Sequence, residues 1–485
     1  MAAHVPQNFR RVITAAAGGN VIEWYDFYIF GSLAAVLSVK FFEKSHPVAA
    51  LLSTIALFTA GFLIRPLGAF LFGWMGDRVG RKYTFLITLS GMALGTGAIG
   101  LIPTFESIGL AAAFILFALR MIQGLCLGGQ YGGAITYVAE HVSDERRGYY
   151  TGWLQTSPTL GIVLSLIVII AIRTYFGNEA FNNWAWRIPF LFSFLLVFIA
   201  IYIRVNFQES PIFEELKAKQ GMTKNPWNEA FLSSNIKFVL MLIAYYVRVN
   251  FQESPIFEEI KAKGAMTKNP WKEAFLSANI KYVLIATIVV LGEGVVWYSG
   301  QFWALYFLQQ VSKVDALTTA YIVGAGLIIG TPTLIFFGWL SDHIGRKPVI
   351  LGGMLLAAVT YYPLYAWLGS ATQPGNINYP IAIIIIAILV AYVGMVYGPI
   401  GAFLAEFFPA RIRYTSVSVP YHIGNGWGGG LVPFITTAAY QATGSLGYAL
   451  IYPIAVPAIA FVLSLFLMPE TRQNSIWAEP AAVKA

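Results

Sequence analysis

Four charged residues interrupt long apolar stretches of this sequence, and their positions make them the first candidates for chemistry. Asp26 and Glu23 are three positions apart and would share one face of a helix, while Arg65 and Arg120 interrupt two later stretches. A charge near the middle of a membrane costs about 2.5–3.5 kcal/mol or more, so such residues usually face a polar cavity and have partners. We therefore predict that Asp26, with Glu23, takes up and releases a proton. Arg120 is the expected partner of Asp26 or the anchor for a substrate carboxylate; the alternative is a fixed structural ion pair.

A second set of polar residues lies on one expected helix face later in the chain. Glu293, Trp297 and Gln301 follow each other at four-residue steps, and Tyr298 lies beside them. A face that combines a carboxylate, aromatic rings and an amide suits a small polar ligand. Glu293 is also a candidate for proton coupling, because it occupies nearly the position in the second half of the chain that Asp26 occupies in the first. Ordinary helix packing explains the same spacing equally well.

A loop with acidic and basic residues occurs twice. Residues 73–82, GWMGDRVGRK, recur as residues 338–347, GWLSDHIGRK. The glycines permit a tight turn, and the aspartate can accept hydrogen bonds from the N–H groups at a helix N-terminus. We predict a cytoplasmic latch that must break before the two halves can rock; the alternative is that these charges only fix the topology. The latch residues are Gly73, Asp77, Arg78, Gly80, Arg81, Lys82, Glu140, Arg147, Asp342, Arg346, Lys347, Glu406 and Arg413.

The composition shows which elements must position these residues. Hydrophobic residues make up 57% of the chain and charged residues only 11%, against about 25% charged residues in soluble domains, so the chain belongs in a lipid bilayer. Apolar stretches long enough to cross it recur along the chain. We expect twelve spans, at residues 12–39, 48–74, 83–103, 107–139, 148–172, 186–205, 281–310, 316–340, 348–368, 379–406, 413–440 and 445–468.

The basic residues indicate the orientation. Most of the net charge of +8 lies in short loops on one side, which is the pattern of cytoplasmic loops rather than of nucleic-acid binding. We expect a multi-pass protein of a bacterial inner membrane with both termini in the cytoplasm.

The repeated loop predicts two related halves, an architecture that many secondary transporters use. We expect an all-α membrane protein with one six-helix bundle in residues 1–205, a cytoplasmic linker in residues 206–280, and a second bundle with a cytoplasmic tail in residues 281–485. The linker contains a tandem duplication, because residues 204–215 reappear unchanged as residues 248–259. Its apolar run at residues 238–247 is about half the length of a span, so we expect that it does not cross the membrane.

Several segments carry a resemblance to a known family. Residues 20–27 (NVIEWYDF), 65–68 (RPLG), 120–124 (RMIQG) and 128–133 (GGQYGG), together with the two loops, make the chain similar to the major facilitator superfamily and in particular to metabolite:proton symporters. The resemblance implies twelve helices, alternating access, and transport of organic acids or zwitterionic osmolytes. The family pattern usually has Glu where this chain has Gln130, which cannot titrate, so coupling here would have to use another acid or be absent.

The expected function is therefore proton-coupled symport of a small organic acid or zwitterion. A uniporter of the same substrates and a non-transporting nutrient sensor are the alternatives. We expect substrate, proton and lipid bilayer as partners, a monomer, and no enzymatic activity, cofactor, metal site or nucleic-acid partner. The residues expected to line the substrate site are Arg120, Arg65, Gln123, Gln130, Tyr131, Trp297, Tyr298, Gln301, Tyr397 and Asn425.

Overall fold

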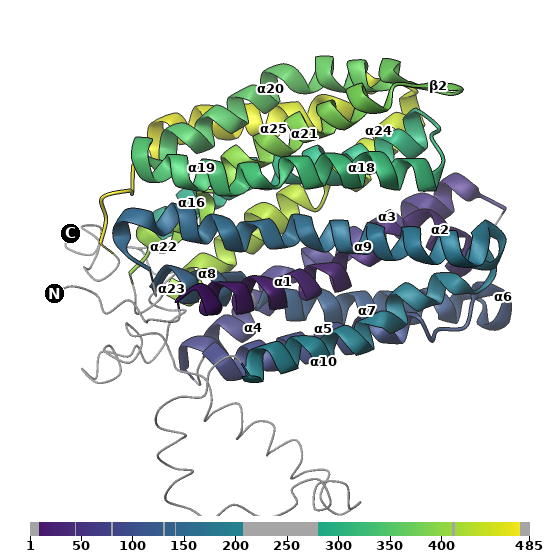
Figure 1. The fold of residues 1–485 in the computed structure, drawn as a ribbon, viewed down its shortest axis with the longest axis horizontal. Coiled ribbons are helices and arrows are strands. Elements are labelled where there is room, and N and C mark those ends of the chain that lie inside the picture. The colour runs from purple at the N-terminus through teal and green to yellow at the C-terminus, as the bar shows by residue number, and fades with distance from the viewer. Residues whose placement is uncertain are drawn as a thin grey trace, which may run out of the picture.

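The computed structural model describes residues 9–43, 45–78, 81–129, 131–140, 142–206, 280–409 and 413–475. Some helical side chains, including those of residues 9–16, 73–78, 81–86 and 201–206, lie outside that description, as do most of the expected linker and its apolar run at residues 238–247. The helices lie roughly along one direction and pack side by side (Figure 1).

Helices account for the first half of the chain. They are α1 (Phe9–Ser32), α2 (Ala34–Phe41), α3 (Pro47–Leu63), α4 (Arg65–Arg78), α5 (Arg81–Ile99), α6 (Phe105–Ile108), α7 (Leu110–Gly128), α8 (Tyr131–Glu140), η1 (Asp144–Arg146), α9 (Arg147–Asn183), η2 (Ala185–Arg187) and α10 (Ile188–Asn206). The apolar helices α1 and α2 meet at a bend of 61°.

The second half is also helical, apart from one short hairpin. Its elements are α16 (Ile280–Tyr298), η3 (Ser299–Trp303), α17 (Ala304–Tyr306), η4 (Phe307–Val311), α18 (Ala316–Gly330), α19 (Pro332–Ile344), α20 (Arg346–Ala371), β1 (Thr372–Gln373), β2 (Asn376–Ile377), α21 (Tyr379–Tyr397), α22 (Ile400–Phe407), α23 (Arg413–Tyr421), η6 (His422–Gly429), α24 (Val432–Thr443) and α25 (Leu446–Leu467). The strands β1 and β2 pair antiparallel, with Thr372 opposite Ile377.

The helices match the twelve expected spans. Within the described residues, eight helices are long and apolar enough to cross a membrane, the bent pair α1–α2 would add a ninth, and two shorter apolar helices cover Ile87–Ile99 and Ala185–Leu196. The remaining expected span, 413–440, is interrupted by the π-helical segment η6, whose sequence HIGNGWGG is rich in glycine. Glycine weakens a helix, and π-helical turns occur often at functional sites.

Local sequence signals explain several helix ends. Pro47 starts α3, where its missing N–H would have no partner anyway. Gly444 adopts a left-handed conformation with φ +66° and ends α24. The Asp315 carboxylate accepts hydrogen bonds from the N–H groups of Leu317 and Thr318 at the start of α18. Although partial burial acts to raise the pKa of Asp315, these hydrogen bonds hold it below its usual value.

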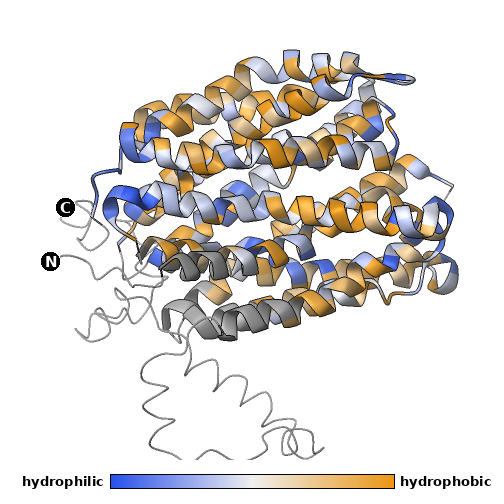
Figure 2. Ribbon diagram, viewed as in Figure 1, coloured by the Kyte–Doolittle hydropathy of each residue, from blue (hydrophilic) through white to orange (hydrophobic). Residues whose placement is uncertain are grey.

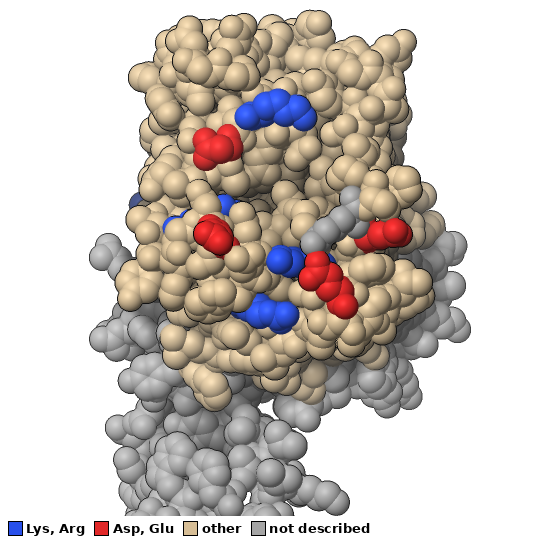
Figure 3. Space-filling view, turned by 90° about the vertical axis from the view of Figure 1, so that its right-hand side faces the viewer, with Lys and Arg blue, Asp and Glu red and all other residues tan. Residues whose placement is uncertain are grey.

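The outer surface of the helices is apolar. Hydrophobic residues predominate along the helices (Figure 2), and large side chains such as Phe114 and Phe466 are 71% and 79% exposed. Figure 3 looks onto the end of the molecule where α6 and β2 lie, and charged side chains are scattered among uncharged ones there. Exposed apolar surface on this scale is what a lipid environment accommodates.

The two halves meet along two seams. Helix α9 packs against α18 and α19, and the pair α3–α4 packs against α23, η6 and α24. Small residues let the backbones approach in the first seam, because a side chain at Gly338 would run into the carbonyl group of Gly148. Close contact through glycine is a common means of helix association in membranes.

Candidate functional site

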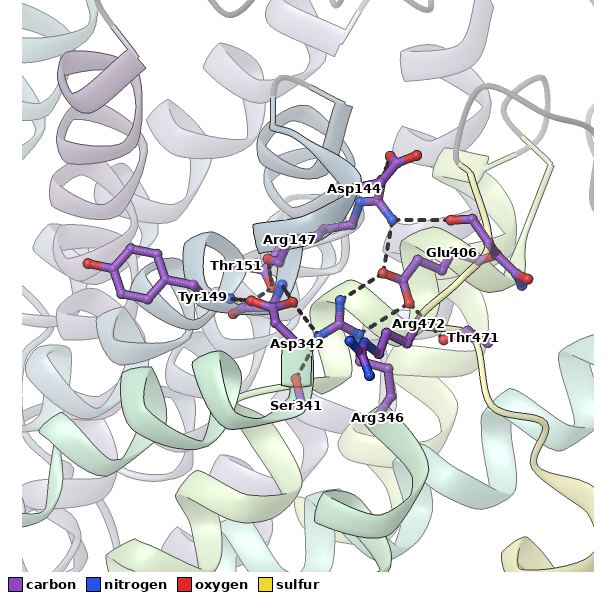
Figure 4. A network of polar contacts seen from close by, with 12 residues as sticks. Asp144, Arg147, Tyr149, Thr151, Ser341, Asp342, Arg346, Glu406, Thr471 and Arg472 are labelled. Atoms are coloured by element: carbon purple, nitrogen blue, oxygen red, sulfur yellow. Dashed lines mark hydrogen bonds and ion pairs between the residues drawn. The ribbon is translucent and has the colours of Figure 1, made fainter. Parts of the chain in front are cut away.

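Asp342 connects the two halves at one end of the bundle (Figure 4). Its Oδ1 accepts a hydrogen bond from the Gly148 N–H at 2.8 Å, and its Oδ2 accepts one from the Tyr149 N–H at 2.7 Å. Gly148 and Tyr149 lie in the first turn of α9, so a carboxylate of the second half caps a helix of the first. The positive end of the α9 dipole strengthens this contact.

Two buried arginines and Glu406 continue the same network. Arg346 lies 2.6 Å from Asp342 Oδ1 through its Nη1 and 2.9 Å from Glu406 Oε1 through its Nη2. Arg147 at the start of α9 reaches the same Glu406 Oε1 at 2.9 Å and also pairs with Asp144. Arg147, Asp342, Arg346 and Glu406, which we call the ion network, thus join α9 to α19, α20 and α22.

The segment after α25 closes over the ion network, which the sequence did not lead us to expect. The Thr471 hydroxyl donates to Glu406 Oε2 at 2.8 Å. Glu470 accepts hydrogen bonds from the backbone N–H groups of Arg346 and Lys347 at 2.9 and 3.0 Å. The only sequence signal was a carboxylate directly after the last apolar stretch.

Other expected latch residues lie elsewhere or outside the description. Lys347 Nζ donates to the Leu465 carbonyl group, and Arg413 Nε donates to the Phe408 carbonyl group. Gly80 and the side chains of the remaining first-half latch residues are outside the described part of the chain: Gly73, Asp77, Arg78, Arg81, Lys82 and Glu140.

Aromatic rings fill the centre of the molecule between the halves. Trp24 stacks on Tyr28 at 4.9 Å between ring centroids, and Tyr28 stacks on Trp297 of the other half at 5.4 Å. The Tyr28 and Tyr298 hydroxyl oxygens are 3.5 Å apart, and the Phe62 ring meets Tyr298 edge-on at 5.0 Å. All five rings are buried. Tyr28 was missed at the sequence level, because aromatic residues are common throughout this chain.

Arg65 points into this aromatic centre. Its side chain is fully buried, and its guanidinium carbon lies 4.0 Å from the Phe62 ring centroid, 4.5 Å from that of Phe27 and 5.3 Å from that of Trp24. None of its three side-chain nitrogens makes a hydrogen bond to a described residue. Cation–π contacts offset part of the cost of burial, but no carboxylate of the described residues pairs with this guanidinium.

Glu293 is the acidic residue at the centre. It is fully buried, and both of its carboxylate oxygens lie 3.3 Å from the Asn425 Nδ2. Tyr298 and Tyr397 each lie within electrostatic range of both Arg65 and Glu293. The expected substrate residues Arg65, Trp297, Tyr298, Tyr397 and Asn425 are therefore brought together, with Glu293.

Tyr131 extends this group. Gln155 Nε2 donates to the Tyr131 hydroxyl at 2.8 Å and to the Tyr397 carbonyl group at 3.1 Å. The Tyr397 and Tyr421 hydroxyls are 3.0 Å apart, and Tyr421 stacks on Tyr131. Gln301 is buried, and its amide has no described hydrogen-bond partner. Gln130 lies outside the described residues.

Asp26 and Arg120 are both fully buried but do not pair with each other, so the first of our two expectations for Arg120, an ion pair with Asp26, is wrong. Arg120 donates to Gln123 Oε1 at 2.5 Å and packs against the rings of Phe27 and Phe30. Helix periodicity placed Arg120 at the right depth but did not determine which neighbour it would face.

Asp26 lies near α10 instead. Ser193 of α10 and Glu23 are among its neighbours, but neither of its carboxylate oxygens has a hydrogen-bond partner among the described residues. The Asp26 carbonyl group accepts a hydrogen bond from Thr96 on α5. Gln123 Nε2 also donates to Thr96, at 2.7 Å, so a hydrogen-bonded path among the described residues runs from Arg120 through Gln123 and Thr96 to the backbone carbonyl group of Asp26.

Comparison with known proteins agrees with this architecture. The family model described as sugar (and other) transporter matches residues 12–478. The chain is 29% identical to the inner membrane metabolite transport protein YhjE of Escherichia coli, over 98% of this chain and 97% of that protein. It is 28% identical to the ectoine/proline transporter ProP of Corynebacterium glutamicum, over 97% of this chain and 86% of that protein.

A solved structure has the same fold. The xylose transporter XylE from Escherichia coli, in a partially occluded inward-open conformation, superimposes with a TM-score of 0.68 at 17% identity and covers 97% of this chain and 100% of its own. Helix arrangement and family match together establish a transporter rather than an enzyme. The chain belongs to the sugar (and other) transporter family, within the major facilitator superfamily.

Proposed function

We propose that this protein is a proton-coupled symporter for a small organic acid or a zwitterionic osmolyte, working by alternating access. The observation that carries the proposal is that Arg65 and Asp26 are buried within membrane-crossing helices and have no neutralising partner among the described residues. A bilayer protein rarely keeps such charges unless they bind cargo or protons. Relatives named as proline/betaine and ectoine/proline transporters support the substrate class.

Alternating access needs contacts that seal one end and can be broken. The ion network joins the halves through side chains that would regain water if α9 and α19 separated. We assign this end to the cytoplasm, because the basic loops lie there. The protein then lies in a bacterial inner membrane with both termini inside, functions as a monomer, and binds substrate and proton between the bundles of residues 1–205 and 281–485.

Asp26 is the proposed proton carrier. In this closed conformation it is buried without a completed hydrogen bond, which favours the neutral acid, whereas exposure to water favours the carboxylate. Binding of a proton would therefore favour the closed form, and release would follow opening. Glu23 shares its surroundings. Gln130 cannot contribute a proton, so the coupling depends on these acids.

Reconstitution in liposomes tests the function. Radiolabelled proline, glycine betaine, succinate and 2-oxoglutarate are offered with and without an inward proton gradient. Uphill accumulation that depends on the gradient is expected, and equilibration without accumulation would indicate a uniporter instead. Binding without flux would indicate a sensor.

The Asp26→Asn variant tests the proton carrier. We expect it to lose accumulation but keep exchange of internal for external substrate, because exchange needs no net proton movement. Normal accumulation by this variant would remove Asp26 from the mechanism. Glu179→Gln, which neutralises an exposed acid, is the matched control and should accumulate substrate normally.

A further inference from the structure

The central aromatic site holds two buried ionisable side chains, one basic and one acidic, that do not pair with each other. Arg65 and Glu293 form no ion pair, and Arg65 pairs with no carboxylate among the described residues. We propose that this site selects zwitterions, with Arg65 binding the carboxylate of the substrate and Glu293 binding its cationic nitrogen. This inference rests on the proposed transport function and decides between the two substrate classes named there.

Arg65 provides the positive pole. A guanidinium presents a planar fork of donors that fits a carboxylate with two parallel hydrogen bonds. Here the whole fork is buried and every side-chain nitrogen lacks a described hydrogen-bond partner. The rings of Trp24, Phe27 and Phe62 hold the group in place, so an entering carboxylate would meet an ordered and unneutralised donor set.

Glu293 provides the negative pole, and it shares the neighbours Tyr298 and Tyr397 with Arg65. Among the described residues, its two oxygens accept hydrogen bonds only from the neutral amide of Asn425, which cannot balance a negative charge. The next residue, Gly426, lies beside Arg65: a side chain placed there would contact the Arg65 Cδ at 3.8 Å. Arg65 and Glu293 therefore contact adjacent residues of η6, which places both at the same segment of the second half.

The lining between the poles suits an ammonium group. The rings of Tyr28, Tyr298 and Tyr397 each contact the Trp297 ring, and all four are buried where the halves meet. Aromatic faces attract substituted ammonium groups through cation–π contacts. Tyrosine hydroxyls can donate to a carboxylate or accept from an N–H.

The same two poles disfavour the other candidate substrates. A dicarboxylate would place its second negative charge near Glu293, and like charges in a buried site repel strongly. A neutral sugar would leave both Arg65 and Glu293 buried without a counter-charge. Specificity arises here from the cost of the wrong charge as much as from contacts with the right one.

Pairs of ligands with the same shape but different charge test the proposal on the wild-type protein. Purified full-length protein in liposomes is assayed for binding and counterflow with glycine betaine against 3,3-dimethylbutyrate, and with L-proline against cyclopentanecarboxylate. Succinate and xylose represent dicarboxylates and neutral sugars. We expect at least one zwitterion to bind and to be transported. Its carbon analogue, which keeps the carboxylate but lacks the cationic nitrogen, should bind at least about tenfold more weakly.

Every other outcome of this ligand panel contradicts one particular part of the proposal. If the carbon analogue binds as well as the zwitterion, Glu293 is not a pole for a cation. If succinate or xylose moves and neither zwitterion does, the substrate class is wrong while the transport function stands. If no member of the panel shows flux, the proposed function fails, and this inference fails with it.

Two isosteric variants locate the poles. Arg65→Gln and Glu293→Gln should each weaken zwitterion binding about tenfold or more. Glu293→Gln should also reduce the difference in affinity between the zwitterion and its carbon analogue. An unchanged difference in affinity in Glu293→Gln would overturn the assignment of Glu293 as the negative pole, even if Arg65→Gln does not fold. Arg173→Gln and Glu179→Gln, away from the aromatic centre, serve as controls and should bind as the wild type does.

Discussion

Replacing Glu406 by Gln tests the ion network most sharply. Glu406 accepts hydrogen bonds from Arg147 at 2.9 Å, from Arg346 at 2.9 and 3.3 Å, and from Thr471 at 2.8 Å. Glutamine keeps the shape and one acceptor oxygen but removes the charge shared by two buried guanidinium groups. In the closed form of this variant, Arg147 and Arg346 stay buried with less negative charge beside them. In the open form water solvates both guanidinium groups, so the variant favours opening.

The size of the effect follows from these contacts. Removing one partner of a buried ion pair costs about 3–5 kcal/mol when the other charge stays buried. In Glu406→Gln, Arg346 still pairs with Asp342, and Arg147 still pairs with Asp144. We therefore expect the closed form to be destabilised by an amount at or below the lower end of this range. A shift of about 1.4–2.8 kcal/mol corresponds to a tenfold to hundredfold larger open population.

Cysteine labelling measures that population. Thr151→Cys, in a Cys126→Ala background, places a thiol at a fully buried position of α9 between the ion network and the central site. In nanodiscs, a water-soluble maleimide should label this thiol about tenfold or more faster when Glu406→Gln is added, because the labelling rate follows the open population. Asp315→Asn, which changes an acid at the opposite end of α18–α19, is the control with no expected change. An unchanged rate in Glu406→Gln would refute the role of the network as a seal.

Three further predictions concern packing and charge. Asp342→Asn should also speed labelling, and its combination with Glu406→Gln should give an effect that is not additive, because both residues bind the same arginine. Gly124→Ala would run a methyl group into a backbone carbonyl oxygen of α3 and should destabilise the protein by about 1–3 kcal/mol in a detergent melting assay, whereas Gly18→Ala in α1, which meets nothing, should leave stability unchanged or raise it. Asp315→Ala should cost about 0.5–2 kcal/mol at neutral pH by removing a helix cap. Because the folded pKa of Asp315 is lowered, that contribution is present above the unfolded value of about 3.9 and is lost as pH falls through the folded value, so the melting temperatures should converge in acid.

Much of the fold could be predicted from the sequence, because hydropathy and bilayer thickness fix where helices must lie. The twelve expected stretches all became helices, including the one that η6 interrupts. The repeated loop led to Asp342 and Arg346, while Glu406 and Arg147 were predicted separately as charges at helix ends. Only the structure shows that these four residues contact one another in a single network.

The contacts that could not be predicted from the sequence depend on the direction in which each helix face points. Arg120 lies at the depth we expected but points at Phe27 and Phe30 rather than at Asp26. Glu470 reaches Arg346 only because the chain turns back after α25. Periodicity gives the face of a helix, but the neighbour on that face comes from the packing of distant segments.

The central claim is that the two halves must separate at the ion-network end during every transport cycle. Cysteines at Thr151 of α9 and Gly401 of α22 test it, because a Cβ at Gly401 would lie 3.4 Å from the Thr151 Cβ, which is close to the separation in a disulfide. In the Cys126→Ala background we expect oxidation to link the halves, to stop uptake into liposomes, and to be reversed by a reducing agent. Uptake at the normal rate by the fully cross-linked protein would contradict alternating access at this end.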